Sequence, residues 1–129
     1  MTMTDSRLDG ITPQEQRQPI WVDVCAVDRL ELDRGVCALV GGDAVAVFRV
    51  SPDGALFAVS NVDPFTGASV MSRGIVGSKG DIIKVSSPML KHAFDLSTGE
   101  HLDDPTISLR TFAARVSAGR VEVACPESA

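Results

Sequence analysis

The sequence lacks long apolar runs, and this absence limits where the protein is expected to work. Residues 1–19 are polar and contain no continuous apolar core of the kind that a secretory signal has. No later window approaches the roughly 20 apolar residues of a membrane-spanning helix. We therefore expect a soluble, cytoplasmic protein with a flexible tail at residues 1–19.

Positive charge is also scarce. The chain has 12 Lys and Arg residues against 17 Asp and Glu residues, which gives a net charge of −5. No Lys/Arg-rich run is present that could follow a phosphate backbone, so nucleic acid is not an expected partner. We interpret the remaining acidic residues as a solvated face: Asp28, Glu31, Asp33, Asp103 and Asp104.

Cysteine is limited to three residues, Cys25, Cys37 and Cys125, without C-x-x-C spacing. An odd count excludes a complete disulfide framework. Cys25 and Cys37 each lie in an apolar run, so we expect reduced, buried thiols that pack as small hydrophobic side chains.

Sustained helical periodicity is absent as well, and turn signals recur about every 8–12 residues, which is typical of an antiparallel β-sandwich or barrel. The prediction is an all-β fold. Residues 63–81 carry four glycines without a clean period, and we expect a long structured loop there, with one helical turn near residues 68–71. Strands are predicted at residues 20–27, in two runs within 35–50, and at 55–62, 82–87, 92–104 and 107–125.

Two loops resemble a metal-binding motif from which the metal ligands are missing. Rieske [2Fe–2S] centres are held by two Cys and two His residues from two loops, C-x-H and later C-x-x-H. The sequence is similar to that family over roughly residues 20–125, which implies a Rieske-like sandwich or barrel with a small loop subdomain at about residues 61–104. The matching residues are Asn61, Pro64, Gly67 and Ala68 in the first loop, and Pro88, Phe94, Asp95, Leu96, Thr98 and Gly99 in the second.

The resemblance places Asp63, Phe65, Ser87 and Leu90 at the four ligand positions. Phe and Leu have no donor atom for iron, and neither loop contains a cysteine, so we expect no [2Fe–2S] cluster and no other metal in this chain. Phe65 and Leu90 are expected to fill the volume that a cluster would occupy. Asp63 and Ser87 are expected to hydrogen-bond backbone groups of the opposite loop.

Three longer motifs narrow the resemblance further: N-x-D-P-F-[ST]-G-A at residues 61–68, S-R-G-[IL]-V-G at 72–77, and S-P-[ML]-x-K at 87–91. Together they resemble the small subunits of assimilatory NAD(P)H-dependent nitrite reductases, which commonly lack the cluster ligands. The resemblance implies a non-catalytic chain in an enzyme that reduces nitrite to ammonium. The expected partner is a large subunit that carries FAD, an iron–sulfur cluster and sirohaem.

A docking surface is predicted at the tip of the two loops, because apolar residues beside a cation suit the centre of an interface. Internal packing of Phe65 and Leu90, and simple solvation of Arg73 and Lys91, remain alternatives. Residues 20–125 are predicted to form one domain, followed by a second tail at 126–129. The predicted docking residues are Pro64, Phe65, Arg73, Met89, Leu90 and Lys91.

Three other interpretations are open from the sequence. The first is a mononuclear metal site, the second a serine hydrolase, and the third a Rieske-derived binding module outside nitrite metabolism. No nucleophile-elbow pattern surrounds the serines, which disfavours a hydrolase. The metal site would use His92, His101, Asp95, Asp103 and Asp104, and the hydrolase Ser86, Ser87 and His92.

Overall fold

The computed structural model describes residues 20–51, 53–89 and 92–125, and these residues form three antiparallel sheets with two short 3₁₀ turns, η2 (Val27–Arg29) and η3 (Met71–Arg73). The predicted tails at 1–19 and 126–129 lie outside the described residues. The strands, in sheet order, are β1 (Ile20–Ala26), β10 (Arg120–Cys125) and β9 (Ala114–Ser117); β2 (Arg34–Val40), β3 (Asp43–Val50), β4 (Ala55–Ser60) and β8 (Thr111–Phe112); and β5 (Ile75–Lys79), β6 (Ile82–Ser86) and β7 (Ala93–Asp95).

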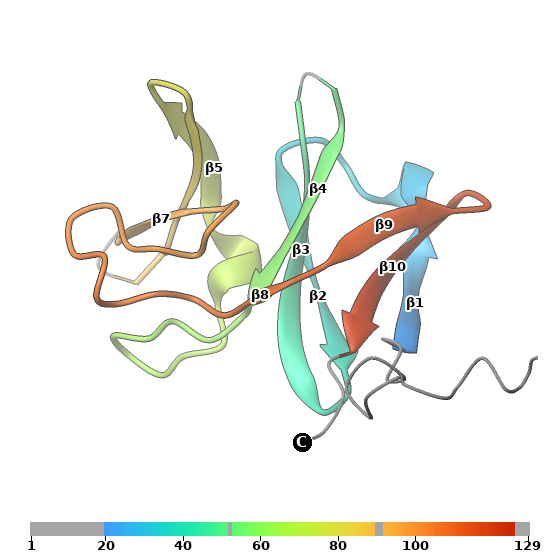
Figure 1. The fold of residues 1–129 in the computed structure, drawn as a ribbon, viewed down its shortest axis with the longest axis horizontal. Helices are drawn as coiled ribbons and strands as arrows, with labels where there is room; N and C mark the ends of the chain where they lie inside the picture. Colours follow the sequence, from blue (N-terminus) through green and yellow to red (C-terminus); the bar gives the residue numbers. More distant parts are fainter. Residues whose placement is uncertain (1–19, 52, 90–91, 126–129) are drawn as a thin grey trace, which may run out of the picture.

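The three sheets are arranged with the β2-β3-β4-β8 sheet in the middle (Figure 1). One apolar cluster joins this sheet to β10, through Val121 and Val123. A second cluster joins its other face to the β5-β6-β7 sheet, through Val85 and Phe94. The molecule is therefore a sandwich of two sheets with a smaller sheet packed against its outer face.

Strand β3 contributes to both clusters because its side chains alternate between the two faces. Val45 and Val47 belong to the cluster shared with β10, whereas Ala46, Phe48 and Val50 belong to the cluster shared with the small sheet. A strand that is covered on both faces reads as a continuous apolar run. This explains why residues 44–48 lack the usual alternation of apolar and polar residues.

Tight turns connect the strands where the sequence predicts them. Gly41 and Gly42 both have positive φ, +60° and +88°, between the paired residues Val40 and Asp43. That is the type I′ geometry whose twist matches a two-residue hairpin. Ala118 and Gly119 repeat it between Ser117 and Arg120. The all-β prediction and both of these hairpins are confirmed.

Two predictions about local structure are wrong. Residues 63–81 are not only a loop, because β5 occupies Ile75–Lys79, and the single turn lies at Met71–Arg73, further along the chain than expected. Cys37 is exposed, not buried, since it faces away from the sandwich on β2, while Cys25 is half-buried. Burial raises the pKa of the Cys25 thiol above its ordinary value.

Candidate functional site at the paired loops

The two predicted loops meet through a hydrogen bond between buried side chains. The Ser87 hydroxyl donates to Oδ2 of Asp63 at 2.6 Å, and both residues are almost completely buried. Each side chain also holds its own loop, because Asp63 Oδ1 accepts the Phe65 amide at 2.8 Å and Ser87 Oγ accepts the Met89 amide at 3.1 Å. The expectation of bonds to the opposite backbone is thus wrong. The side chains bond directly across the loops, and each caps a turn in its own loop.

Phe65 lies over a pair of histidines. Its ring stacks on His92 with centroids 3.8 Å apart, and Nδ1 of His92 lies 3.2 Å from Nε2 of His101. Nδ1 of His101 accepts the amides of Asp103 and Asp104, so the proton of the neutral His101 ring is placed on Nε2, from which it donates to His92. Phe65 is 38% exposed, which leaves one side of the ring open while the other packs internally.

The donor set of these loops does not fit a [2Fe–2S] cluster. Thiolates are the principal ligands of such clusters, whereas these positions hold a carboxyl, a phenyl ring and a hydroxyl in Asp63, Phe65 and Ser87. Asp63 and Ser87 are occupied by their mutual hydrogen bond. The fourth position, Leu90, lies outside the described residues.

The alternative metal site is not assembled either. The described residues contain no group of three or more His, Cys, Asp or Glu side chains that could hold a metal ion. Asp95 and Asp104 accept hydrogen bonds in their own turns, from Ser97 and Thr106. The Thr106 hydroxyl and amide, with a smaller contribution from His101, lower the pKa of Asp104. His101 is only 6% exposed, so its ring is buried and is not open to a metal ion from solvent.

A serine nucleophile has no support from the geometry. The Ser87 hydroxyl donates to Asp63 and not to a histidine. The bond between Ser87 and His92 runs through the backbone, from the Ser87 amide to the His92 carbonyl at 2.7 Å. His92 directs its ring towards Phe65 and His101.

The outer surface of the loops exposes apolar residues beside a cation. Pro64 and Arg73 are exposed, and Met89 is 41% exposed. Leu90 and Lys91, the other two predicted docking residues, lie outside the described residues. Sequence reasoning missed Ile75, which is 75% exposed. Its position within the 72–77 motif is the sequence signal that could have identified it.

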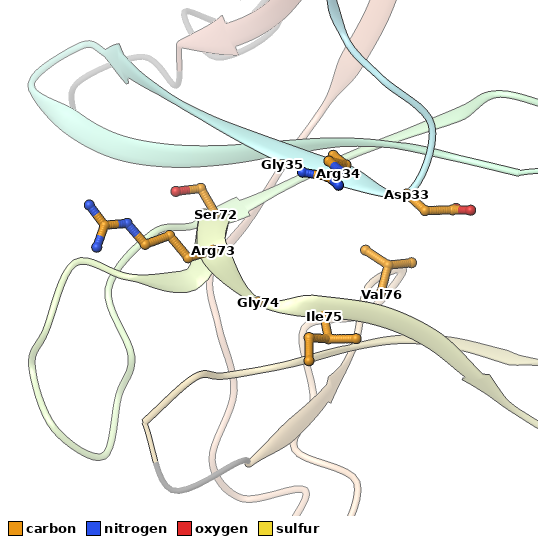
Figure 2. A pocket seen from close by; sticks show the side chains of 8 residues that line it. All are labelled: Asp33, Arg34, Gly35, Ser72, Arg73, Gly74, Ile75 and Val76. Carbon is orange, nitrogen blue, oxygen red and sulfur yellow. The ribbon is translucent and has the colours of Figure 1, made fainter.

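Two clefts flank Arg73 and Ile75. One, of about 410 Å³, is mainly apolar and is lined by these two residues together with Ser86, Ser87 and Pro88. The other, of about 500 Å³, lies between β5 and the start of β2 (Figure 2). Gly35, which lines this cleft, packs on Phe48 and on the Ser72 carbonyl so tightly that a Cβ would not fit. The surface at the loop tip therefore continues along β5.

The comparisons with known proteins agree with this geometry. The family model for the Rieske-like [2Fe-2S] domain matches residues 20–124. The nitrite reductase (NADH) small subunit of Escherichia coli K12 is 40% identical over 103 residues, which are 80% of this chain and 95% of that protein. A crystal structure of a Mycobacterium tuberculosis protein, described as an NADH-dependent nitrite reductase small subunit, superposes with a TM-score of 0.83 at 48% identity. The superposition covers 87% of this chain and all of that one.

A relative of a different kind is also similar to this chain. The nitrite reductase [NAD(P)H] large subunit of Klebsiella oxytoca is 30% identical over 103 residues, which are 80% of this chain but 11% of that protein. The fold and the paired loops thus define a Rieske-like domain. Within that class, the chain belongs to the family of nitrite reductase (NADH) small subunits. The described residues include no helix long and apolar enough to cross a membrane.

Proposed function

We propose that this chain is the cluster-free small subunit of an NAD(P)H-dependent nitrite reductase that reduces nitrite to ammonium in the cytoplasm during nitrate and nitrite assimilation. The observation that carries the proposal is the 40% identity to an E. coli nitrite reductase small subunit over nearly its whole length. Its partner is the large subunit, which supplies FAD, an iron–sulfur cluster and sirohaem. The chain itself is not catalytic.

The side chains at the four ligand positions lack the donor atoms that a cluster needs. Two of the four aligned positions, Phe65 and Leu90, carry only carbon in the side chain. The other two, Asp63 and Ser87, form a buried hydrogen bond of 2.6 Å in the space where iron would need thiolates. We therefore assign the two loops a supporting role, in which they hold a surface for the partner instead of an electron carrier.

The proposed docking surface is the loop tip formed by Pro64, Phe65, Arg73 and Met89, with Leu90 and Lys91 beside it in the sequence. Partly exposed aromatic and apolar side chains near an Arg are typical of interface centres. The similarity to a segment of a Klebsiella oxytoca large subunit supports this role, because there the same kind of domain is part of the large chain itself. We treat residues 20–125 as one domain with a loop subdomain at about 61–104.

Nitrite-dependent NADH oxidation tests the proposal. The large subunit is assayed alone, with the small chain, and with a Phe65→Asp, Met89→Asp variant of it. We expect the full rate with the unmodified chain and with the control variant, and a reduced rate in the other two assays. Leu39→Asp is the matched control, because Leu39 is an apolar residue that is 73% exposed on β2. A rate that is independent of the small chain would contradict the proposal and favour a binding module outside nitrite metabolism.

The purified small chain is analysed for iron and acid-labile sulfide in parallel. We expect neither above background, and a colourless protein. Stoichiometric sulfide after reconstitution would contradict the cluster-free assignment while leaving the family membership intact.

A further inference from the structure

Strand β5 has a free edge. It pairs with β6 on one side only, and within the described residues no strand pairs with its second side, which faces the start of β2 across the cleft of Figure 2. A free strand edge presents unpaired backbone groups that can template pairing with another chain. Monomeric proteins usually block or cover such edges. We therefore ask which chain segment could pair with the free edge of β5.

The register identifies which residues of β5 face outward. In an antiparallel pair, residues alternate between those that bond to the neighbour and those that bond to the other side. The Ile83 carbonyl accepts the Leu96 amide at 2.9 Å, so Ile83 bonds towards the β7 side of β6. Its β5 partner, Ser78, is therefore in a non-hydrogen-bonded pair, as is Val76 two residues earlier. The N–H and C=O groups of Val76 and Ser78 point to the free edge.

A groove follows this edge. The cleft of Figure 2 is lined by Ile75 and Val76, and a second cleft of about 180 Å³ is lined by Val76, Gly77 and Ser78. The second cleft also reaches Ile83 on β6, Val50 at the end of β3, and Ser51, so the two clefts lie between β5 and the central sheet, beside the free edge. Asp33 lines both clefts from the opposite wall.

The charges at the end of the groove favour an acidic occupant. Arg73 is exposed and takes part in no ion pair among the described residues. Arg34 contacts Glu31 at 3.6 Å, but both side chains are about three-quarters exposed, and such pairs are weak. The Asp33 carboxylate is already engaged by the Ser51 amide and hydroxyl, at 2.9 and 2.7 Å. These two arginines therefore remain available to an incoming carboxylate.

We propose that an extended, acidic segment of the large subunit adds to β5 as a fourth strand of the small sheet. Its backbone bonds to Val76 and Ser78, and a carboxylate of the segment binds Arg73 and Arg34. This mode of recognition is β-augmentation, in which main-chain bonds give affinity and side-chain contacts give specificity. The inference rests on the proposed function, because it takes the large subunit as the partner, and it adds the chemistry of the contact.

Ser78 allows a sharp test, because its amide faces the groove and its side chain is exposed without a hydrogen bond of its own. Ser78→Pro removes the outward donor without removing a bond to β6, whereas Ser78→Ala keeps the donor. With purified large subunit in a titration, we expect Ser78→Pro and Arg73→Glu each to raise Kd about tenfold, the cost of one lost backbone or charged hydrogen bond. Ser78→Ala should bind as the unmodified chain does.

Amide hydrogen exchange of the unmodified chain gives an independent readout if Ser78→Pro fails to fold. Binding of the large subunit should slow exchange at Val76 and Ser78, while Gly77, already paired with Lys84 on β6, changes little. Unchanged exchange at Val76 and Ser78, or equal affinity of Ser78→Pro and Ser78→Ala, overturns the inference. So does slowed exchange in the absence of the partner when the small chain is concentrated, which would assign the edge to a second copy. A failure of the unmodified chain to bind would instead overturn the proposed function.

Discussion

Asp63 and Ser87 join the two loops through a direct hydrogen bond between their side chains. Their side chains are buried and bonded to each other, and each also accepts an amide of its own loop. Buried polar groups are stable only when hydrogen-bonded. The pair therefore fixes both loop backbones, and with them the positions of Phe65 and Met89 on the exposed surface.

Ser87→Ala tests this pair. The variant leaves the Asp63 carboxyl and the Met89 amide without their partner, and an unsatisfied buried group costs about 1–3 kcal/mol. We expect the free energy of unfolding, measured by urea denaturation, to fall by that amount. Ser78→Ala is the control, since the Ser78 side chain is exposed, and it should have no effect. Equal stability of the two variants would show that the loops are held by packing alone.

For these individual residues, the sequence predicted their positions in the two loops but not the contacts that their side chains make. The motifs were sufficient to place Asp63, Phe65 and Ser87 in facing loops. The sequence did not predict that Ser87 bonds directly to Asp63 or that His101 is buried beneath Phe65. Both contacts depend on how closely the two loops approach in space, and Asp63 and Ser87 are 24 residues apart in the chain. The exposure of Cys37 was missed because an apolar run does not reveal which of its residues faces outward at a sheet edge.

Among the elements, the hairpin that follows β7 depends on a glycine. Gly99 has φ of +83°, and a Cβ at this position would collide with the Leu109 carbonyl. The two residues are also joined by a hydrogen bond from the Leu109 amide to the Gly99 carbonyl at 2.7 Å. The turn therefore anchors the segment that carries Leu109 into the core.

Gly99→Ala is expected to destabilise the protein by at least about 2 kcal/mol, because it combines left-handed backbone strain with a steric collision. Thermal or urea unfolding measures the loss. Gly77→Ala is a suitable comparison, since its φ is not positive and the nearest atom, Lys84 Cε, would lie at an ordinary 3.7 Å. A similar loss in both variants would argue against a special role for the turn.

Sequence reasoning did not find strand β5. Gly77 lies within it and Gly74 and Gly80 flank it, and glycine is normally depleted in strands. Gly74 and Gly80 each have a local reason that the sequence does not display. A Cβ on Gly74 would collide with the Ser86 carbonyl, and Gly80 has positive φ in the turn to β6. By contrast, β3 and its hairpins were predictable, since valine favours strands and glycine adopts the positive φ that tight hairpin turns require.

For the molecule as a whole, the pKa values of several surface carboxylates depend on hydrogen bonds that exist only in the folded state. Asp23 accepts two hydrogen bonds from Arg120, which join β1 to β10. These bonds, and to a lesser extent the guanidinium charge, lower the pKa of Asp23. Hydrogen bonds from Ser51 lower the pKa of Asp33 in the same direction. These contacts make the fold sensitive to acid.

The direction of that sensitivity follows from proton linkage. The folded pKa values lie below the ordinary aspartate value of 3.8, so the unfolded chain binds protons first as the pH falls. The stabilisation is present above about pH 4 and is lost as the pH falls through the folded pKa values. Urea denaturation between pH 7 and pH 3 should show this loss, and Asp33→Asn should reduce it. A stability that is constant down to pH 3 would contradict the expectation.

The burial of β3 on both faces has a consequence for biosynthesis. Part of its cover comes from Val121 and Val123 on β10, about 75 residues later in the chain. During translation the apolar run must therefore leave the ribosome long before the strand that shields it exists. Such a segment is prone to pairing with other chains until β10 has been synthesised. Arg49 is a charged residue within β3, and a charge of this kind opposes such pairing. Strand β10, made well after β3, completes the sandwich and ends this exposure.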